Sequence, residues 1–184
     1  IAETVYDMGY TKIITEGAKH ILGWKSPNYV YHAATRPKLK VLLKNSRFSD
    51  DIAYRFSNYS WNEYPLTADK FISWIAATPP EEKVINLFMN YETLGNLQPA
   101  HSGIFEFIKA LPQFAEEKGI GFTTPSEAMD TLTPIGAVNV PNTISWADEE
   151  RDVSAWLGNK LQQSALKSLY EMGERVRLCT DRRL

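Results

Sequence analysis

Two acidic residues in this 184-residue chain each lie close behind a short apolar run. Glu16 directly follows Ile13-Ile14-Thr15, and Glu92 follows Leu87-Phe88-Met89 after two intervening residues. The C-terminal ends of parallel strands meet at one edge of a sheet. We therefore expect the two carboxylates to face one cleft. Most glycoside hydrolases use a pair of carboxyl groups as their catalytic residues.

A third polar segment precedes the last predicted helix. Residues 145–152 read Ser-Trp-Ala-Asp-Glu-Glu-Arg-Asp. A tryptophan ring offers a flat apolar face to a sugar, and carboxylates accept hydrogen bonds from hydroxyl groups. This segment therefore favours a carbohydrate ligand.

Each of these features also has a purely structural explanation. An acid after a strand often begins a helix, where the helix dipole favours negative charge. Residues 145–152 can form the solvated first turn of a helix, with Ser145 as its N-cap. Each of the five tryptophans can be a core residue. The residue types alone leave these alternatives open.

Metal and disulfide chemistry have little support in the sequence. The three histidines, His20, His32 and His101, lack the spacing of metal ligands. The single cysteine, Cys179, excludes an internal disulfide and a cysteine-based zinc cluster. We therefore expect no metal and no cofactor.

Short β-like runs alternate with amphipathic helical stretches along the chain. Strands are expected at residues 12–15, 29–31, 39–43, 84–89, 120–123 and 137–140. Helices are expected at residues 2–8, 49–56, 67–78, 102–118, 125–132 and 157–178. The clearest strand is 84–89, which is nearly all apolar, as in a strand covered on both faces.

This alternation predicts parallel strands joined by crossover helices. The count of about five or six strands is too small for a closed eight-stranded barrel. The expected fold class is therefore α/β, with a partial parallel, TIM-like barrel.

Charge and hydropathy exclude other classes of protein. Twenty basic and 22 acidic residues give a net charge of -2, which argues against a nucleic-acid groove. The apolar runs are too short to span a bilayer, so we expect no membrane contact. The first residues, Ile1-Ala2-Glu3-Thr4, show no leader pattern and read as mid-protein sequence. The expected location is cytoplasmic.

Three segments together carry a resemblance to a known family. Residues 15–24 read Thr-Glu-Gly-Ala-Lys-His-Ile-Leu-Gly-Trp, and residues 89–95 read Met-Asn-Tyr-Glu-Thr-Leu-Gly. Residues 144–159 begin Ile-Ser-Trp-Ala-Asp-Glu-Glu-Arg-Asp. In type, order and spacing these segments resemble three conserved regions of glycoside hydrolase family 57, of the α-amylase type.

The resemblance implies an incomplete (β/α)7 barrel and a retaining mechanism. Glu16 corresponds to the catalytic nucleophile, and position 90 corresponds to the general acid/base. The implied ligand is an α-glucan or maltooligosaccharide. Six residues inside the matched segments become candidates for substrate contacts: His20, Trp24, Glu92, Trp146, Asp148 and Glu149.

The chain departs from the family pattern at position 90. The family has aspartate there, whereas this chain has Asn90, which cannot transfer a proton as an acid/base catalyst. The neighbouring residues differ as well. Where the family usually reads Phe-Gly-Glu-His, residues 94–97 read Leu-Gly-Asn-Leu.

The family's first two conserved regions and its later helical region have no counterpart here. We therefore expect residues 1–184 to be the C-terminal part of the catalytic barrel, ending in a long helix. The expected partner is the remainder of the barrel and the helical region. Three functions stay open: an α-1,4-glucan hydrolase, a catalytically impaired α-amylase-like carbohydrate-binding protein, and a structural half-domain.

Overall fold

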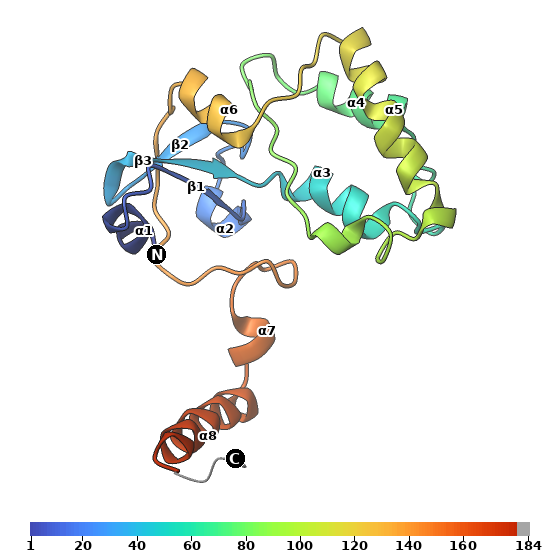
Figure 1. Ribbon diagram of the computed structural model, residues 1–184. Helices are drawn as coiled ribbons and strands as arrows, with labels where there is room; N and C mark the ends of the chain where they lie inside the picture. Colours follow the sequence, from blue (N-terminus) through green and yellow to red (C-terminus); the bar gives the residue numbers. More distant parts are fainter. Residues whose placement is uncertain (180–184) are drawn as a thin grey trace. The chain divides into compact units, whose positions relative to one another are not determined.

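The computed structural model describes residues 1–179 (Figure 1). The chain divides into two compact units, Ile1–Asn139 and Val140–Leu184. We describe each unit by itself. All of the strands assigned in the described residues lie in the first unit.

The first unit is built on a four-stranded sheet with the order β1-β3-β2-β4. The strands are β1 (Lys12–Thr15), β2 (Val30–Ala33), β3 (Arg36–Leu43) and β4 (Ala137–Val138). β1 runs parallel to β3, and β2 runs parallel to β4. The mixed α/β class is confirmed. The described sheet is open, and the partial (β/α)7-type barrel stays a prediction.

One strand pair differs from the expected parallel arrangement. β2 and β3 are antiparallel, with Ala33 opposite Arg36 across a two-residue connection. A connection this short can only form a hairpin, because a parallel pair needs a crossover of a dozen residues or more.

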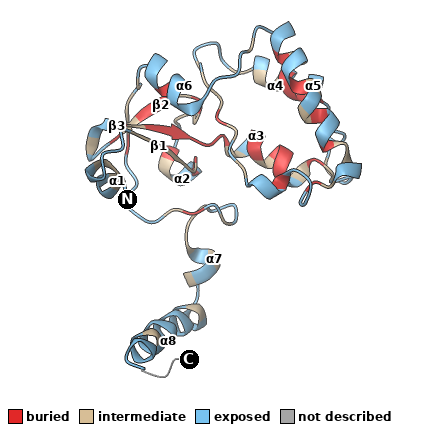
Figure 2. Ribbon diagram, viewed as in Figure 1, coloured by how far each residue is buried: buried red, intermediate tan, exposed pale blue. Residues whose placement is uncertain are grey.

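Helices cover both faces of the sheet. The helices of this unit are α1 (Ala2–Asp7), α2 (Lys19–Leu22), α3 (Ser46–Asp50), α4 (Ala68–Ala76), α5 (Ile104–Glu117) and α6 (Pro125–Thr131). A π-helical segment, η1 (Asp51–Arg55), extends α3, and the 3-10 turns η2 (Tyr91–Thr93) and η3 (Ala100–Ser102) precede α5. Leu39, Val41 and Leu43 pack with residues of α1 and α2, whereas Leu42 packs with Met129 of α6. The alternation along β3 thus buries both of its faces (Figure 2).

Two helices begin at other residues than the sequence predicts. Asn45, rather than Ser49, caps α3, because its side-chain oxygen accepts from the Phe48 N–H at 3.0 Å. Gly103, rather than Ser102, is the N-cap of α5, with a left-handed φ of 85° that suits glycine. α5 then continues through Pro112.

Two predicted strands are wrong. Residues 84–89 and 120–123 form no strand. Ile85, Leu87 and Met89 nevertheless pack against the helical core, as the apolar pattern predicts. Both segments line the same cavity of about 710 Å³, so the space beside them is not filled by a neighbouring strand. The expected burial is met only in part, because Phe88 and Phe122 are exposed, and a ladder also needs a paired neighbour.

A second core lies between α3, α4 and α5. Phe71 has no exposed surface, and its ring centroid lies 5.6 Å from that of Phe48 and 5.7 Å from that of Phe107. Both contacts are edge-to-face, the arrangement that aromatic pairs prefer. Phe71 therefore joins the helices into one cluster.

Phe71→Ala is expected to lower the free energy of unfolding by about 3–5 kcal/mol, because it leaves a cavity among rings that cannot collapse fully. Chemical denaturation of the purified protein measures this change. The matched control is Phe122→Ala, which removes an exposed ring and should cost within about 0.5 kcal/mol. Equal losses in the two variants would contradict the central place of Phe71.

The described part of the second unit, residues 140–179, contains two helices, α7 (Ser154–Leu157) and α8 (Lys160–Arg177). Asn159 and Gln162 form a capping box that begins α8. The expected helix over 157–178 is therefore confirmed in its main part, with a break at Gly158. None of the described helices is long and apolar enough to cross a membrane.

Candidate functional site

Glu16 and Lys44 lie at the same edge of the sheet. Glu16 directly follows β1 and Lys44 directly follows β3. The two strands are parallel, with Thr15 opposite Leu43, and the Lys44 N–H donates to the Thr15 carbonyl at 2.9 Å. The edge is therefore the C-terminal one, where α/β folds place their sites.

Both carboxylate oxygens of Glu16 have partners. The Ser46 hydroxyl donates to Oε1 at 2.5 Å, and Lys44 Nζ lies 3.5 Å from Oε2. Lys44 Nζ also lies 3.3 Å from Asp50 Oδ1. The side chains of Glu16 and Lys44 are only 9% and 8% exposed. The carboxylate thus has a fixed orientation in a largely buried charged cluster.

Local packing fixes this cluster. A Cβ on Gly17 would lie 2.2 Å from the Lys44 carbonyl oxygen, so no other residue fits there without moving the backbone. Asn45 caps α3 and also donates from Nδ2 to Asn28 Oδ1 at 2.9 Å. Asn28 in turn donates to Glu82 Oε2 at 2.6 Å. The N-terminus of α3, which carries Ser46, is therefore held by a hydrogen-bonded network.

The segment that leads to Asn90 runs along α3. The Asn45 N–H donates to the Asn86 carbonyl at 2.9 Å, and the Phe88 N–H donates to Ser49 Oγ at 3.1 Å. Glu16 and residues 86–88 thus contact the same short stretch of chain, residues 45–49. The chain that leads to Asn90 is therefore attached to the same turn as Glu16, and a cleft shared by Glu16 and position 90 stays a prediction.

Asn90 itself is exposed, and its Nδ2 donates to Glu92 Oε1 at 3.2 Å. Tyr91, beside them, is 94% exposed. The structure therefore brings together Asn90 and Glu92, two of the predicted site residues, on an open surface.

The other candidates fall into two places. His20 lies on α2 and is exposed, and Trp24, just after α2, is 93% exposed, so the core alternative for Trp24 is wrong. Trp146, Asp148 and Glu149 lie in the second unit. There the rings of Trp146 and Trp156 meet edge-to-face with centroids 5.9 Å apart. By contrast, Trp61 and Trp74 pack against the helical core, as the structural explanation predicts.

The helical alternative for residues 145–152 is wrong. α7 begins only at Ser154. Asp148 and Arg151 have positive φ angles of 52° and 55°, which a helix does not allow. Ser145 Oγ instead accepts from the Ala147 N–H, and the Ser145 N–H donates to the Arg151 carbonyl. The segment is therefore an ordered loop that exposes its acids and Trp146.

Sequence reasoning missed Lys44, Ser46 and Asp50. The strand-end rule that selected Glu16 also applies to the residues after β3, so Lys44 and Ser46 could have been found.

Next to this cluster, burial raises the pKa of the Asp51 carboxyl, and Arg55 at 2.6 Å partly offsets that rise. In the part of the chain that the structure describes, no group of three or more His, Cys, Asp or Glu side chains could hold a metal ion.

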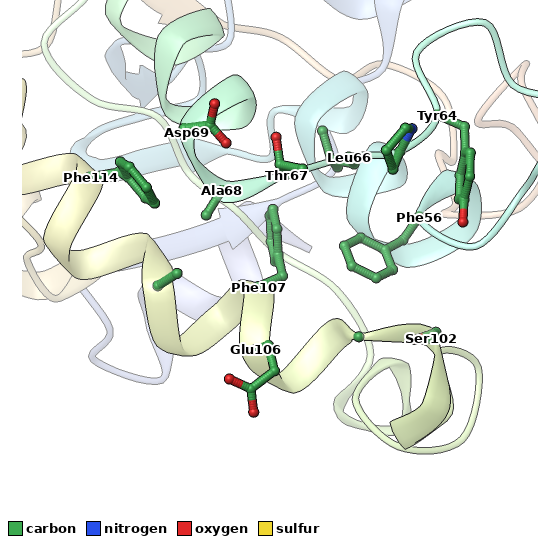
Figure 3. Close-up of a pocket in the computed structure, with 13 residues that line it drawn as sticks. Phe56, Tyr64, Leu66, Thr67, Ala68, Asp69, Ser102, Glu106, Phe107 and Phe114 are labelled. Atoms are coloured by element: carbon green, nitrogen blue, oxygen red, sulfur yellow. The ribbon is translucent and has the colours of Figure 1, made fainter.

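A separate hollow of about 320 Å³ lies between α5 and the chain that leads into α4. Figure 3 shows Phe56, Tyr64 and Phe107 lying near one another along it. Its lining includes none of the residues predicted for the site. The cavity of about 710 Å³ includes none of them either, so the candidate site rests on the contacts at the strand ends.

Comparison with known proteins identifies the family. A family model described as Glycosyl hydrolase family 57 matches residues 1–141. The chain belongs to glycosyl hydrolase family 57. The residues matched to the family include both Glu16 and Asn90. No solved structure matches the chain.

A relative from Methanocaldococcus jannaschii, named "Putative alpha-amylase", is 47% identical over 180 residues. The match covers 96% of this chain but only 38% of the relative. The chain thus spans well under half the length of this family 57 relative.

Proposed function

We propose that this chain supplies the nucleophile side of an α-glucan cleft in a retaining, α-amylase-like glycoside hydrolase. The observation that carries the proposal is the position of Glu16. Glu16 lies at the C-terminal edge of two parallel strands, and Ser46 and Lys44 orient its carboxylate. The chain that carries it belongs to a family of glycosyl hydrolases. A nucleophile that must meet an anomeric carbon needs such a fixed orientation.

In this reaction Glu16 attacks the anomeric carbon, and the glycosidic oxygen leaves. Water then hydrolyses the glycosyl-enzyme. Position 90 is the proposed acid/base, which protonates the leaving oxygen and later activates water. The proposed substrate contacts are His20, Trp24, Glu92, Trp146, Asp148 and Glu149. The exposed rings of Trp24 and Trp146 support their role as sugar platforms.

We also propose that residues 1–184 are the later part of an incomplete (β/α)7 barrel. Two observations support this. The relative extends well beyond the aligned part. The apolar segment 84–89 has no strand partner, and Asn86 Nδ2 is buried without a hydrogen-bond partner. A neighbouring strand would satisfy such groups.

A second function is supported by Asn90. An amide cannot donate a catalytic proton, and here it donates a hydrogen bond to Glu92. The alternative is therefore a catalytically impaired, α-amylase-like protein that binds maltooligosaccharides without efficient hydrolysis.

An activated aryl α-maltoside tests whether Glu16 acts as a nucleophile even without an acid at position 90, because its leaving group needs little protonation. We expect the full-length protein to form a covalent adduct on the peptide that contains Glu16, detected by mass spectrometry. The exposed control Glu116→Gln should form it equally. If no adduct forms but maltooligosaccharide binds, the impaired binding protein is favoured. If nothing binds, both proposals fail.

A further inference from the structure

Lys44 lies between two carboxylates at the candidate site. Its Nζ is 3.5 Å from Glu16 Oε2 and 3.3 Å from Asp50 Oδ1. All three side chains are largely buried. A buried ammonium is costly unless it is paired, and its electrostatic effect on a neighbour is stronger than in water. The Lys44 ammonium is therefore placed directly beside the carboxylate of Glu16.

We infer that Lys44 is a positioning residue that assists the second step of the reaction, the release of Glu16 from the glycosyl-enzyme. This inference rests on the proposed function of Glu16. It assigns to Lys44 a role separate from the acid/base role of position 90.

The charge changes of the two steps lead to this assignment. In the first step, an electron pair of Glu16 forms a bond to the anomeric carbon, and the aryl oxygen leaves with the pair of the broken bond. The negative charge on Glu16 is lost, because an ester is neutral. In the second step, water attacks that carbon, the bond to Glu16 breaks with its pair returning to the carboxylate, and the proton of water passes to solvent.

An ammonium beside the carboxylate favours the charged form of Glu16. It therefore weakens the nucleophile slightly in the first step and improves the leaving group in the second. The Ser46 hydrogen bond holds the other oxygen in place. Asp50 also pairs with Lys44 Nζ, and its negative charge partly offsets the effect of the ammonium on Glu16. Loss of Lys44 should thus slow breakdown of the glycosyl-enzyme more than its formation.

The test compares Lys44→Met and Lys44→Arg in the full-length protein with an activated aryl α-maltoside. Rapid-mixing measurement of phenolate release gives adduct formation, and mass spectrometry over time gives adduct breakdown. In Lys44→Met we expect the adduct to persist about 10- to 100-fold longer, the range for losing a contact to a charged group. Lys44→Arg keeps the charge and should recover much of the breakdown rate.

Two further variants keep the test decisive. Lys40→Met removes the same charge within β3, four residues before Lys44. The Lys40 Nζ instead donates to the Met129 carbonyl, so this variant should leave the adduct lifetime unchanged. Asp50→Asn removes the carboxylate that partly offsets the Lys44 charge and should shorten the adduct lifetime. This variant tests the inference even if Lys44→Met does not fold. If the parent protein forms the adduct, an unchanged adduct lifetime in Lys44→Met would overturn the role of Lys44 alone. A lifetime that is not shortened in Asp50→Asn would do the same. Absence of any parent adduct on Glu16 would instead reject the proposed function and the inference with it.

Discussion

Asn90→Asp in the full-length protein is expected to raise hydrolysis of an unactivated maltooligosaccharide by about 10²–10⁴-fold, the usual contribution of a general acid/base. An aspartate can protonate the leaving oxygen and then activate water, whereas the amide can do neither. Sugar release from maltoheptaose, followed by chromatography, measures the change. Cleavage of an activated aryl substrate should gain much less in its first step.

The matched control for this variant is Asn62→Asp. It introduces the same carboxylate at another exposed position, outside the segments that resemble the family. It should leave hydrolysis unchanged. If Asn90→Asp gives no gain either, the other departures in the loop of Asn90 matter more than position 90. Leu94 and Leu97 are the first to consider, because both expose apolar surface there.

Glu16→Gln in the Asn90→Asp background is expected to lower hydrolysis by about 10³-fold or more, since removing the nucleophile of a hydrolase can cost up to about 10⁶-fold. The amide has nearly the same shape but cannot form the glycosyl ester. The same measurement of sugar release applies, and no adduct should form on the variant peptide.

Glu16→Ala with added azide separates chemistry from structure. Azide can enter the space left by the carboxylate and attack the anomeric carbon of an activated α-glycoside from the opposite face. We expect a β-glycosyl azide, identified by NMR. If Glu16 only pairs with Lys44 to stabilise the fold, Glu16→Gln would lower the unfolding free energy but leave turnover by the folded fraction unchanged.

The part of the site that could be predicted follows from a local rule. Glu16 was found because it follows β1, and the structure places it at the C-terminal edge of two parallel strands. The hairpin between β2 and β3 could also have been predicted, because two residues cannot make a crossover. These features depend on short stretches of sequence.

The part that could not be predicted depends on residues far apart in the chain. Residues 84–89 have the pattern of a buried strand, and Ile85, Leu87 and Met89 are partly buried against the helical core. A ladder, however, depends on a neighbour that their own sequence does not specify. The bond from Ser46 to Glu16 joins residues 30 positions apart. Periodicity carries no information on such a pair, so its geometry required the structure.

The exposure of Trp24 could not be predicted from the sequence either. An apolar residue after a buried Leu22 favours a core position on composition alone. Gly23 has a positive φ of 60°, and the ring that follows it is solvent-exposed. A tryptophan exposed in this way close to Glu16 in sequence is better explained by a ligand or a partner surface than by the core.

The proposed retaining mechanism requires Glu16 and position 90 to face one cleft. The most direct test is the separation of their carboxyl carbons in a crystal structure of the full-length Asn90→Asp variant with bound maltooligosaccharide. A retaining pair predicts roughly 5–5.5 Å, with the anomeric carbon between the two groups. A separation of about 6.5 Å or more, or side chains on opposite faces of the sheet, would contradict this mechanism.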